Sequence, residues 1–141
     1  MKRNIENQLR DWKNDPDRKV LLVRGARQVG KTYSVRCLAP NFEHFLEVNF
    51  EEEPATRQFF EGSLNPESIC QKLTAYFDAP ITPGKTLVFL DEIQSCPNAL
   101  KALRFFHEKA PTLHVVAAGS LLEFVLGDLP SFGVGRITSL F

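Results

Sequence analysis

The pattern of apolar and polar positions predicts a regular alternation of strands and helices. Short apolar runs without alternation are typical of strands that are covered on both faces. Residues 20–23 form such a run, and further strands are predicted at residues 45–50, 86–90 and 113–118. A fifth strand is expected to begin within residues 137–141, at the end of the sequence. The strands are therefore expected to be buried inside the domain.

Apolar positions at helical spacing predict the segments that connect these strands. Ile5, Leu9 and Trp12 form an amphipathic stripe in an N-terminal helix of residues 1–14, which Asp15-Pro16-Asp17 terminates. Further helices are predicted at residues 31–38, after Pro54, at 66–77 and at 97–109. Strand, crossover helix and strand, repeated, imply a mainly parallel sheet between helices. We therefore predict an α/β fold, a three-layer αβα sandwich in one domain of residues 1–141.

Composition agrees with a single globular domain and gives one hint about a ligand. Of the 141 residues, 43% are hydrophobic and 24% are charged, and 17 basic side chains balance 17 acidic ones. This balance gives no indication of nucleic acid or of an anionic membrane as a partner. Residues 1–36 nevertheless carry 10 basic and 4 acidic side chains, whereas residues 37–141 carry 7 and 13. The basic third would suit an anionic ligand.

Cysteine usage and hydropathy predict a cytoplasmic protein. Cys37, Cys70 and Cys96 are far apart and show no zinc-site spacing, so we expect reduced and mostly buried thiols. No histidine stands at ligand spacing either. The N-terminus lacks the apolar segment of a signal peptide, and polar residues interrupt the longest apolar stretch, 113–126.

A glycine-rich turn separates the first predicted strand from the helix that follows it. Its sequence, GARQVGKT at residues 25–32, has the pattern G-x-x-x-x-G-K-[ST] of a phosphate-binding loop, or Walker A motif. The two glycines let successive N–H groups point into one hollow at the helix N-terminus. Lys31 adds a charge for the outer phosphates, and the Thr32 hydroxyl can bind magnesium. The predicted nucleotide-binding residues are Gly25, Gln28, Val29, Gly30, Lys31, Thr32 and Tyr33. The ordinary alternative is a glycine turn with an exposed lysine.

Two acidic residues follow the third predicted strand and have the form of a Walker B motif. Asp91 emerges at the carboxyl end of this strand, where it can hold magnesium through water. Glu92 can orient and deprotonate an attacking water. Polar residues also follow strands simply because the chain must leave the sheet. The 60 residues between Lys31 and Asp91 leave room for an intervening strand, as in ATPases with an additional strand between the two motifs.

Four segments together resemble a known family. RGARQVGKT, VFLDEIQ, AAGSLLEF and SFGVGR occur in this order, and the likeness extends from about Lys19 onward. They are similar to the prokaryotic AAA-type ATP-binding proteins of the archaeal-ATPase-like group. The resemblance implies a P-loop NTPase fold of the additional-strand type, with ATP and Mg²⁺ as ligands. Members are usually longer, so residues 1–141 are expected to be an N-terminal ATPase core that lacks an uncharacterised C-terminal domain.

The resemblance also assigns roles to single residues. Gly25, Gly30, Lys31 and Thr32 would bind phosphates and magnesium, Asp91 would serve the metal, and the catalytic set would be Glu92, Lys31, Ser120 and Arg136. Ser120 would be the polar sensor after the fourth strand, or it simply caps a helix through a capping box with Glu123. Arg136 would be an arginine finger, or it is an exposed loop arginine. Position 133 is glycine where family members often have proline.

Three functional hypotheses follow. The first is magnesium-dependent ATP hydrolysis, with ATP and ADP as ligands, an unknown protein partner and a homo-oligomer if Arg136 acts on a neighbouring subunit. The second is a nucleotide-dependent binding switch with negligible hydrolysis. The third, a small-molecule P-loop kinase, ranks last because no arginine-rich lid segment follows Ser120. ATP is preferred over GTP by the family likeness, and the guanine-binding sequence N-K-x-D is absent.

Overall fold

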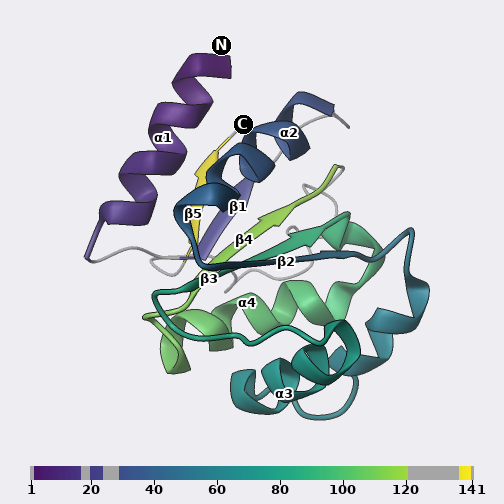
Figure 1. Cartoon of the computed structure of the whole chain (residues 1–141). Coiled ribbons are helices and arrows are strands. Elements are labelled where there is room, and N and C mark those ends of the chain that lie inside the picture. Colours follow the sequence, from purple (N-terminus) through teal and green to yellow (C-terminus); the bar gives the residue numbers. More distant parts are fainter. Residues whose placement is uncertain (1, 17–19, 24–28, 121–136, 141) are drawn as a thin grey trace.

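A parallel sheet lies between two layers of helices (Figure 1). The computed structural model describes residues 2–16, 20–23, 29–120 and 137–140, with side chains for 7–16, 20–23 and 32–120. The strands are β1 Val20–Val23, β2 His44–Asn49, β3 Thr86–Asp91, β4 His114–Ala118 and β5 Ile137–Leu140. The α-helices are α1 Lys2–Asn14, α2 Val29–Leu38, α3 Pro66–Phe77 and α4 Pro97–Lys109. Within the described ranges, the predicted order of strands and helices is confirmed.

The sheet has the order β2-β3-β4-β1-β5, and every described pairing is parallel. In this register Leu21 of β1 pairs with Val116 of β4, and Val88 of β3 pairs with Val115 of β4. Strand β4 therefore lies between β1 and β3. The predicted αβα fold with an additional strand is confirmed, because the strand that leads to Asp91 is separated from β1 by one intervening strand.

The helices cover the two faces of the sheet in pairs. In Figure 1, α1 and α2 lie over one face, whereas α3 and α4 lie over the other. The segment after Pro54 is a 3₁₀ helix, η2 Pro54–Phe60, rather than an α-helix. Its hydroxyl residue Thr56 bonds back to the carbonyl of Glu53, 2.7 Å away, and only seven residues are available. In such short segments, few hydrogen bonds are available to offset the unfavourable free energy of nucleating an α-helix.

Side chains of the central strands alternate between two hydrophobic cores. Leu22, Leu90 and Ala117 contribute to the core beside α3 and α4. Leu21 and Phe89 contribute to the core beside α1 and α2. Each fully buried leucine or phenylalanine stabilises the fold by about 1.5–3 kcal/mol relative to an exposed one. The apolar side chains that these strands direct to both faces therefore follow from helix coverage on both faces.

One cysteine differs in its placement from the sequence-based expectation, whereas His114 agrees with it. Cys96 is buried and Cys70 is half-buried, but Cys37 is exposed on α2, so the prediction of mostly buried thiols is wrong for Cys37. The buried side of α2 is instead formed by neighbours such as Val35. His114 has the structural role that its lack of ligand spacing indicated, since its ring packs edge-on against Trp12 at a centroid distance of 5.4 Å.

No helix in the described part of the chain is long and apolar enough to cross a membrane. This agrees with the interrupted apolar stretch at residues 113–126 of the sequence.

Candidate functional site

The carboxyl ends of the parallel strands meet at one edge of the sheet (Figure 1). Asn49 ends β2, Asp91 ends β3, and Ser120 stands two residues after β4. Helix α2 begins at Val29, and five residues separate it from the end of β1 at Val23. In open α/β sheets this edge is the usual place of the ligand.

Thr32 and Asp91 are brought together here from positions 59 residues apart. The Thr32 hydroxyl donates a hydrogen bond to Oδ2 of Asp91 over 3.3 Å. Oδ1 of the same carboxylate accepts the backbone N–H of Glu92 at 2.9 Å. Asp91 is only 6% exposed, although it is an acidic residue. A carboxylate at such a place has a functional explanation more often than a structural one.

Burial raises the pKa of the Asp91 carboxyl above its ordinary value. The hydrogen bonds from Glu92 N–H and from the Thr32 hydroxyl oppose this rise, whereas the negative charges of Glu92 and Glu47 add to it. Desolvation has the largest effect of these. A cation bound beside the carboxylate would favour the ionised form and so relieve the cost of burial.

Glu92 occupies a backbone conformation that is uncommon for its residue type. Its φ of 54° and ψ of 46° lie in the left-handed region, directly before the 3₁₀ helix η3 Ile93–Ser95. This conformation costs of order 1 kcal/mol or more for a residue with a side chain, and it is found preferentially at functional sites. Oε1 of Glu92 accepts a hydrogen bond from Nε2 of Gln94 at 2.8 Å.

Ser120 joins the same group through its main chain. Its N–H donates to Oε1 of Gln94 at 3.2 Å. The preceding residue, Gly119, donates its N–H to the carbonyl of Val23 at 3.3 Å, which ties the end of β4 to the end of β1. The helix that Ser120 was predicted to cap falls on residues 121–136, outside the described part, so both readings of Ser120 stay predictions.

Only some of the remaining predicted site residues lie in the described part of the chain. Gly25, Gln28 and Arg136 lie outside the described residues. Val29, Gly30 and Lys31 form the backbone of the first turn of α2, and the side chain of Tyr33 in the same helix is 50% exposed. The structure thus brings Thr32, Asp91, Glu92 and Ser120 to one edge of the sheet, together with the start of α2.

Sequence reasoning missed two residues at this edge, Gln94 and Glu51. Nε2 of Gln94 also approaches Oε2 of Glu51 at 3.4 Å, and the Ser95 hydroxyl donates to the same oxygen at 3.2 Å. Asn49 holds this turn in place, because its Oδ1 accepts the N–H of Glu51 at 2.9 Å. The only available signal for Gln94 was its place two residues after Glu92, since its partners are up to 43 residues away.

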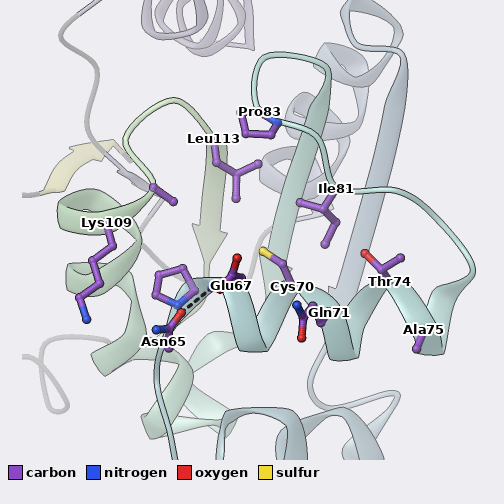
Figure 2. A pocket seen from close by; sticks show the side chains of 12 residues that line it. Asn65, Glu67, Cys70, Gln71, Thr74, Ala75, Ile81, Pro83, Lys109 and Leu113 are labelled. Atoms are coloured by element: carbon purple, nitrogen blue, oxygen red, sulfur yellow. Dashed lines mark hydrogen bonds between the residues drawn. The ribbon is translucent and has the colours of Figure 1, made fainter.

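A separate pocket lies at the opposite end of the strands, beside α3 (Figure 2). It has a volume of about 780 Å³ and is lined by residues that precede β3 and β4, among them Pro83 and Leu113. Figure 2 shows the thiol of Cys70 among these apolar side chains. Burial raises the pKa of Cys70 to about 11, so the thiol is protonated at neutral pH and is a poor nucleophile. The pocket shares no residue with the Asp91 edge.

Comparison with known proteins identifies the family. A family model described as AAA domain matches residues 17–141, which include both the glycine-rich turn and the strand that ends at Asp91. A comparison with curated proteins found no match. The matched region covers most of the chain and contains the whole sheet with β4 between β1 and β3. The chain therefore belongs to the AAA domain family and contains a nucleotide-binding domain of the ATPase type.

Proposed function

We propose that this domain binds ATP with magnesium and hydrolyses it at the carboxyl edge of the sheet. The observation that carries the proposal is the contact between the Thr32 hydroxyl and the Asp91 carboxylate, with Glu92 as the next residue. A hydroxyl and a carboxylate are hard oxygen ligands of the type that Mg²⁺ prefers. Two such groups at the start of a helix and the end of a neighbouring strand suit a nucleotide with its metal.

The donor set fits the ion in detail. Because Thr32 donates its proton to Asp91, its oxygen lone pairs are left for the metal. The Asp91 carboxylate can then accept hydrogen bonds from the waters of the ion, as proteins usually leave several waters on Mg²⁺. When bound, the ion would neutralise part of the phosphate charge. Asp91 and Thr32 are our proposed metal residues.

The start of α2 would bind the phosphates. The N–H groups of the first helical turn have no intrahelical acceptor, and the helix dipole favours an anion there. The proposed binding residues are Gly25, Gln28, Val29, Gly30, Lys31, Thr32 and Tyr33, with Lys31 supplying the charge for the outer phosphates. Support comes from the position of Val29 as the first residue of α2 at this edge of the sheet.

Glu92 would orient the attacking water and accept its proton. Ser120 would sense the outer phosphate from the end of β4, and Arg136 would stabilise charge in the transition state, from the same or a neighbouring subunit. No protein group needs to form a bond to phosphorus, so positioning and charge stabilisation supply the catalysis. The proposed role of Glu92 in hydrolysis can be tested separately from nucleotide binding.

Substituting Glu92→Gln tests this assignment. The variant keeps the size of the side chain but cannot accept a proton, so we expect ATP binding to persist while kcat falls by a factor on the order of 100 or more. ATP affinity and phosphate release should be measured on the same preparation. Glu67→Gln, an exposed glutamate on α3, serves as the matched control with unchanged turnover. Full turnover in the Glu92→Gln variant would refute the proposed role.

The alternative function is a nucleotide-dependent switch with negligible hydrolysis. One observation favours it, namely that Oε1 of Glu92 accepts a hydrogen bond from Gln94 and so has one acceptor position less for a water. Single-turnover phosphate release at increasing protein concentration separates the two. A neighbouring subunit that supplies Arg136 predicts a rate that rises with concentration, whereas the switch predicts negligible release throughout.

A further inference from the structure

Gln94 connects the ends of three strands through one side chain. Its Nε2 donates to Oε1 of Glu92 at 2.8 Å, and its Oε1 accepts the N–H of Ser120 at 3.2 Å. A longer contact of 3.4 Å joins Nε2 to Glu51, which follows β2. The side chain is partly buried and belongs to η3, directly after the left-handed turn at Glu92.

A carboxamide is suited to this set of bonds. The carboxamide carries donors on nitrogen and acceptor positions on oxygen, so it can give a proton to a carboxylate and receive one from a main-chain N–H. A glutamate at position 94 would keep the acceptor for Ser120 but would repel Glu92. A leucine of similar size would lose both bonds.

Gly119 leaves the space that the amide occupies. A Cβ atom at this position would collide with Oε1 of Gln94 and would come within 3.3 Å of Cγ2 of Ile93. Gly119 has no positive φ that would require glycine for its backbone. A side chain at position 119 would therefore displace the end of the Gln94 side chain, whose Oε1 accepts the N–H of Ser120.

We propose that Gln94 is a positioning residue that fixes the carboxylate of Glu92 and links it to the segment at Ser120. The inference rests on the proposed function, in which Glu92 acts on the attacking water. Through the bridge, the position of the β4 end, where the outer phosphate would be sensed, controls the orientation of Glu92. A shift of about 1 Å in such a group lowers the rate by as much as about 100-fold without weakening substrate binding.

The test compares three variants with wild type in the full chain. Gln94→Leu removes all three contacts, Gln94→Glu keeps only the acceptor for the N–H of Ser120, and Gly119→Ala leaves Gln94 intact but displaces its amide. We expect all three variants to lower kcat by about 10- to 100-fold, as is usual when a residue that orients a functional group is replaced, with the Kd for ATP unchanged. Gln71→Leu, at an exposed glutamine on α3, is the control with normal kcat. Circular dichroism should show the same folded spectrum for every variant.

A second measurement detects the bridge, meaning the hydrogen bonds of Gln94 to Glu92 and to Ser120, without relying on turnover. In ¹⁵N spectra of this 16.0 kDa chain, the side-chain amide signal of Gln94 should move in the Glu92→Gln variant. The backbone signal of Ser120 should move in the Gln94→Leu variant and stay in place in Gln71→Leu. An unmoved Ser120 signal in Gln94→Leu would overturn the bridge.

The outcomes separate this inference from the proposed function. Loss of turnover in Glu92→Gln together with full turnover in Gln94→Leu and Gly119→Ala would overturn the positioning role alone. Full turnover in Glu92→Gln would overturn the proposed role of Glu92 and the positioning role with it. Equal losses in kcat and in ATP affinity for all Gln94 variants would also contradict positioning, because they would indicate a general disturbance of the site.

Discussion

At the residue scale, the buried carboxylate of Asp91 lowers the stability of the fold at a position that suits a cation. Its carboxylate is buried beside the Thr32 hydroxyl, and burial raises its pKa. In the absence of a cation, the ionised side chain is therefore less favourable in the folded chain than in the unfolded one. Such a cost is expected where a residue is selected for a ligand rather than for the fold.

This cost gives a pH-dependent prediction for Asp91→Asn without nucleotide or magnesium. Below the ordinary aspartate pKa of about 3.9, the carboxyl is protonated in both states. As the pH rises towards the raised native pKa, the unfolded chain loses its proton first, so wild type loses stability through this window. The asparagine side chain has no charge to bury. The melting temperature of Asp91→Asn relative to wild type should therefore increase as the pH rises above about 4, and a difference that does not change with pH would contradict the assigned pKa direction.

At the scale of elements, strands β1, β3 and β4 connect the two hydrophobic cores on opposite faces of the sheet. Each has alternate side chains in the α3/α4 core and in the α1/α2 core. A change on one face therefore acts on strands that the other face also requires. We expect the two cores to unfold together, as is usual for a single domain of this size.

Leu103→Ala tests this coupling from one side of the sheet. Leu103 of α4 is fully buried, so its truncation should lower the free energy of unfolding by about 2–5 kcal/mol. Trp12, the only tryptophan, reports on the opposite core. Its fluorescence transition should shift to lower denaturant by the same amount as the circular dichroism transition. Lys101→Ala, exposed on the same helix, should change stability by no more than about 0.5 kcal/mol, and an unmoved tryptophan transition in Leu103→Ala would show that the cores unfold separately.

The element boundaries were predictable where local chemistry fixes them. The run Val20–Val23 is apolar throughout and became β1 with the predicted bounds. Pro66 and Pro97 begin α3 and α4 because their missing N–H groups are not needed in a first turn. The 3₁₀ form of Pro54–Phe60 was not predicted, since it depends on a hydroxyl bond and on the short length of the segment.

At the scale of the whole molecule, part of the candidate site could be predicted from the two sequence motifs, at residues 25–32 and at Asp91 and Glu92. Asp91 and Thr32 meet because parallel strands end at one edge and β4 fits between β1 and β3. The bridge at Gln94 could not be predicted, because it depends on the left-handed turn at Glu92 and on the space beside Gly119. The spacing of residues within one motif does not reveal contacts between strand ends that are far apart in the sequence.

The central claim is that Thr32 and Asp91 form a metal-assisted nucleotide site, and calorimetric titration with ATP tests it most directly. Wild type should bind ATP at one site, more tightly with magnesium than without it, and ADP and GTP should be titrated alongside. Thr32→Val keeps the shape of the side chain but removes the hydroxyl. We expect this variant to lose about 10- to 100-fold of the magnesium-dependent affinity, while its affinity without magnesium stays close to that of wild type. An equal magnesium enhancement in wild type and Thr32→Val, or no ATP binding by wild type, would contradict the account.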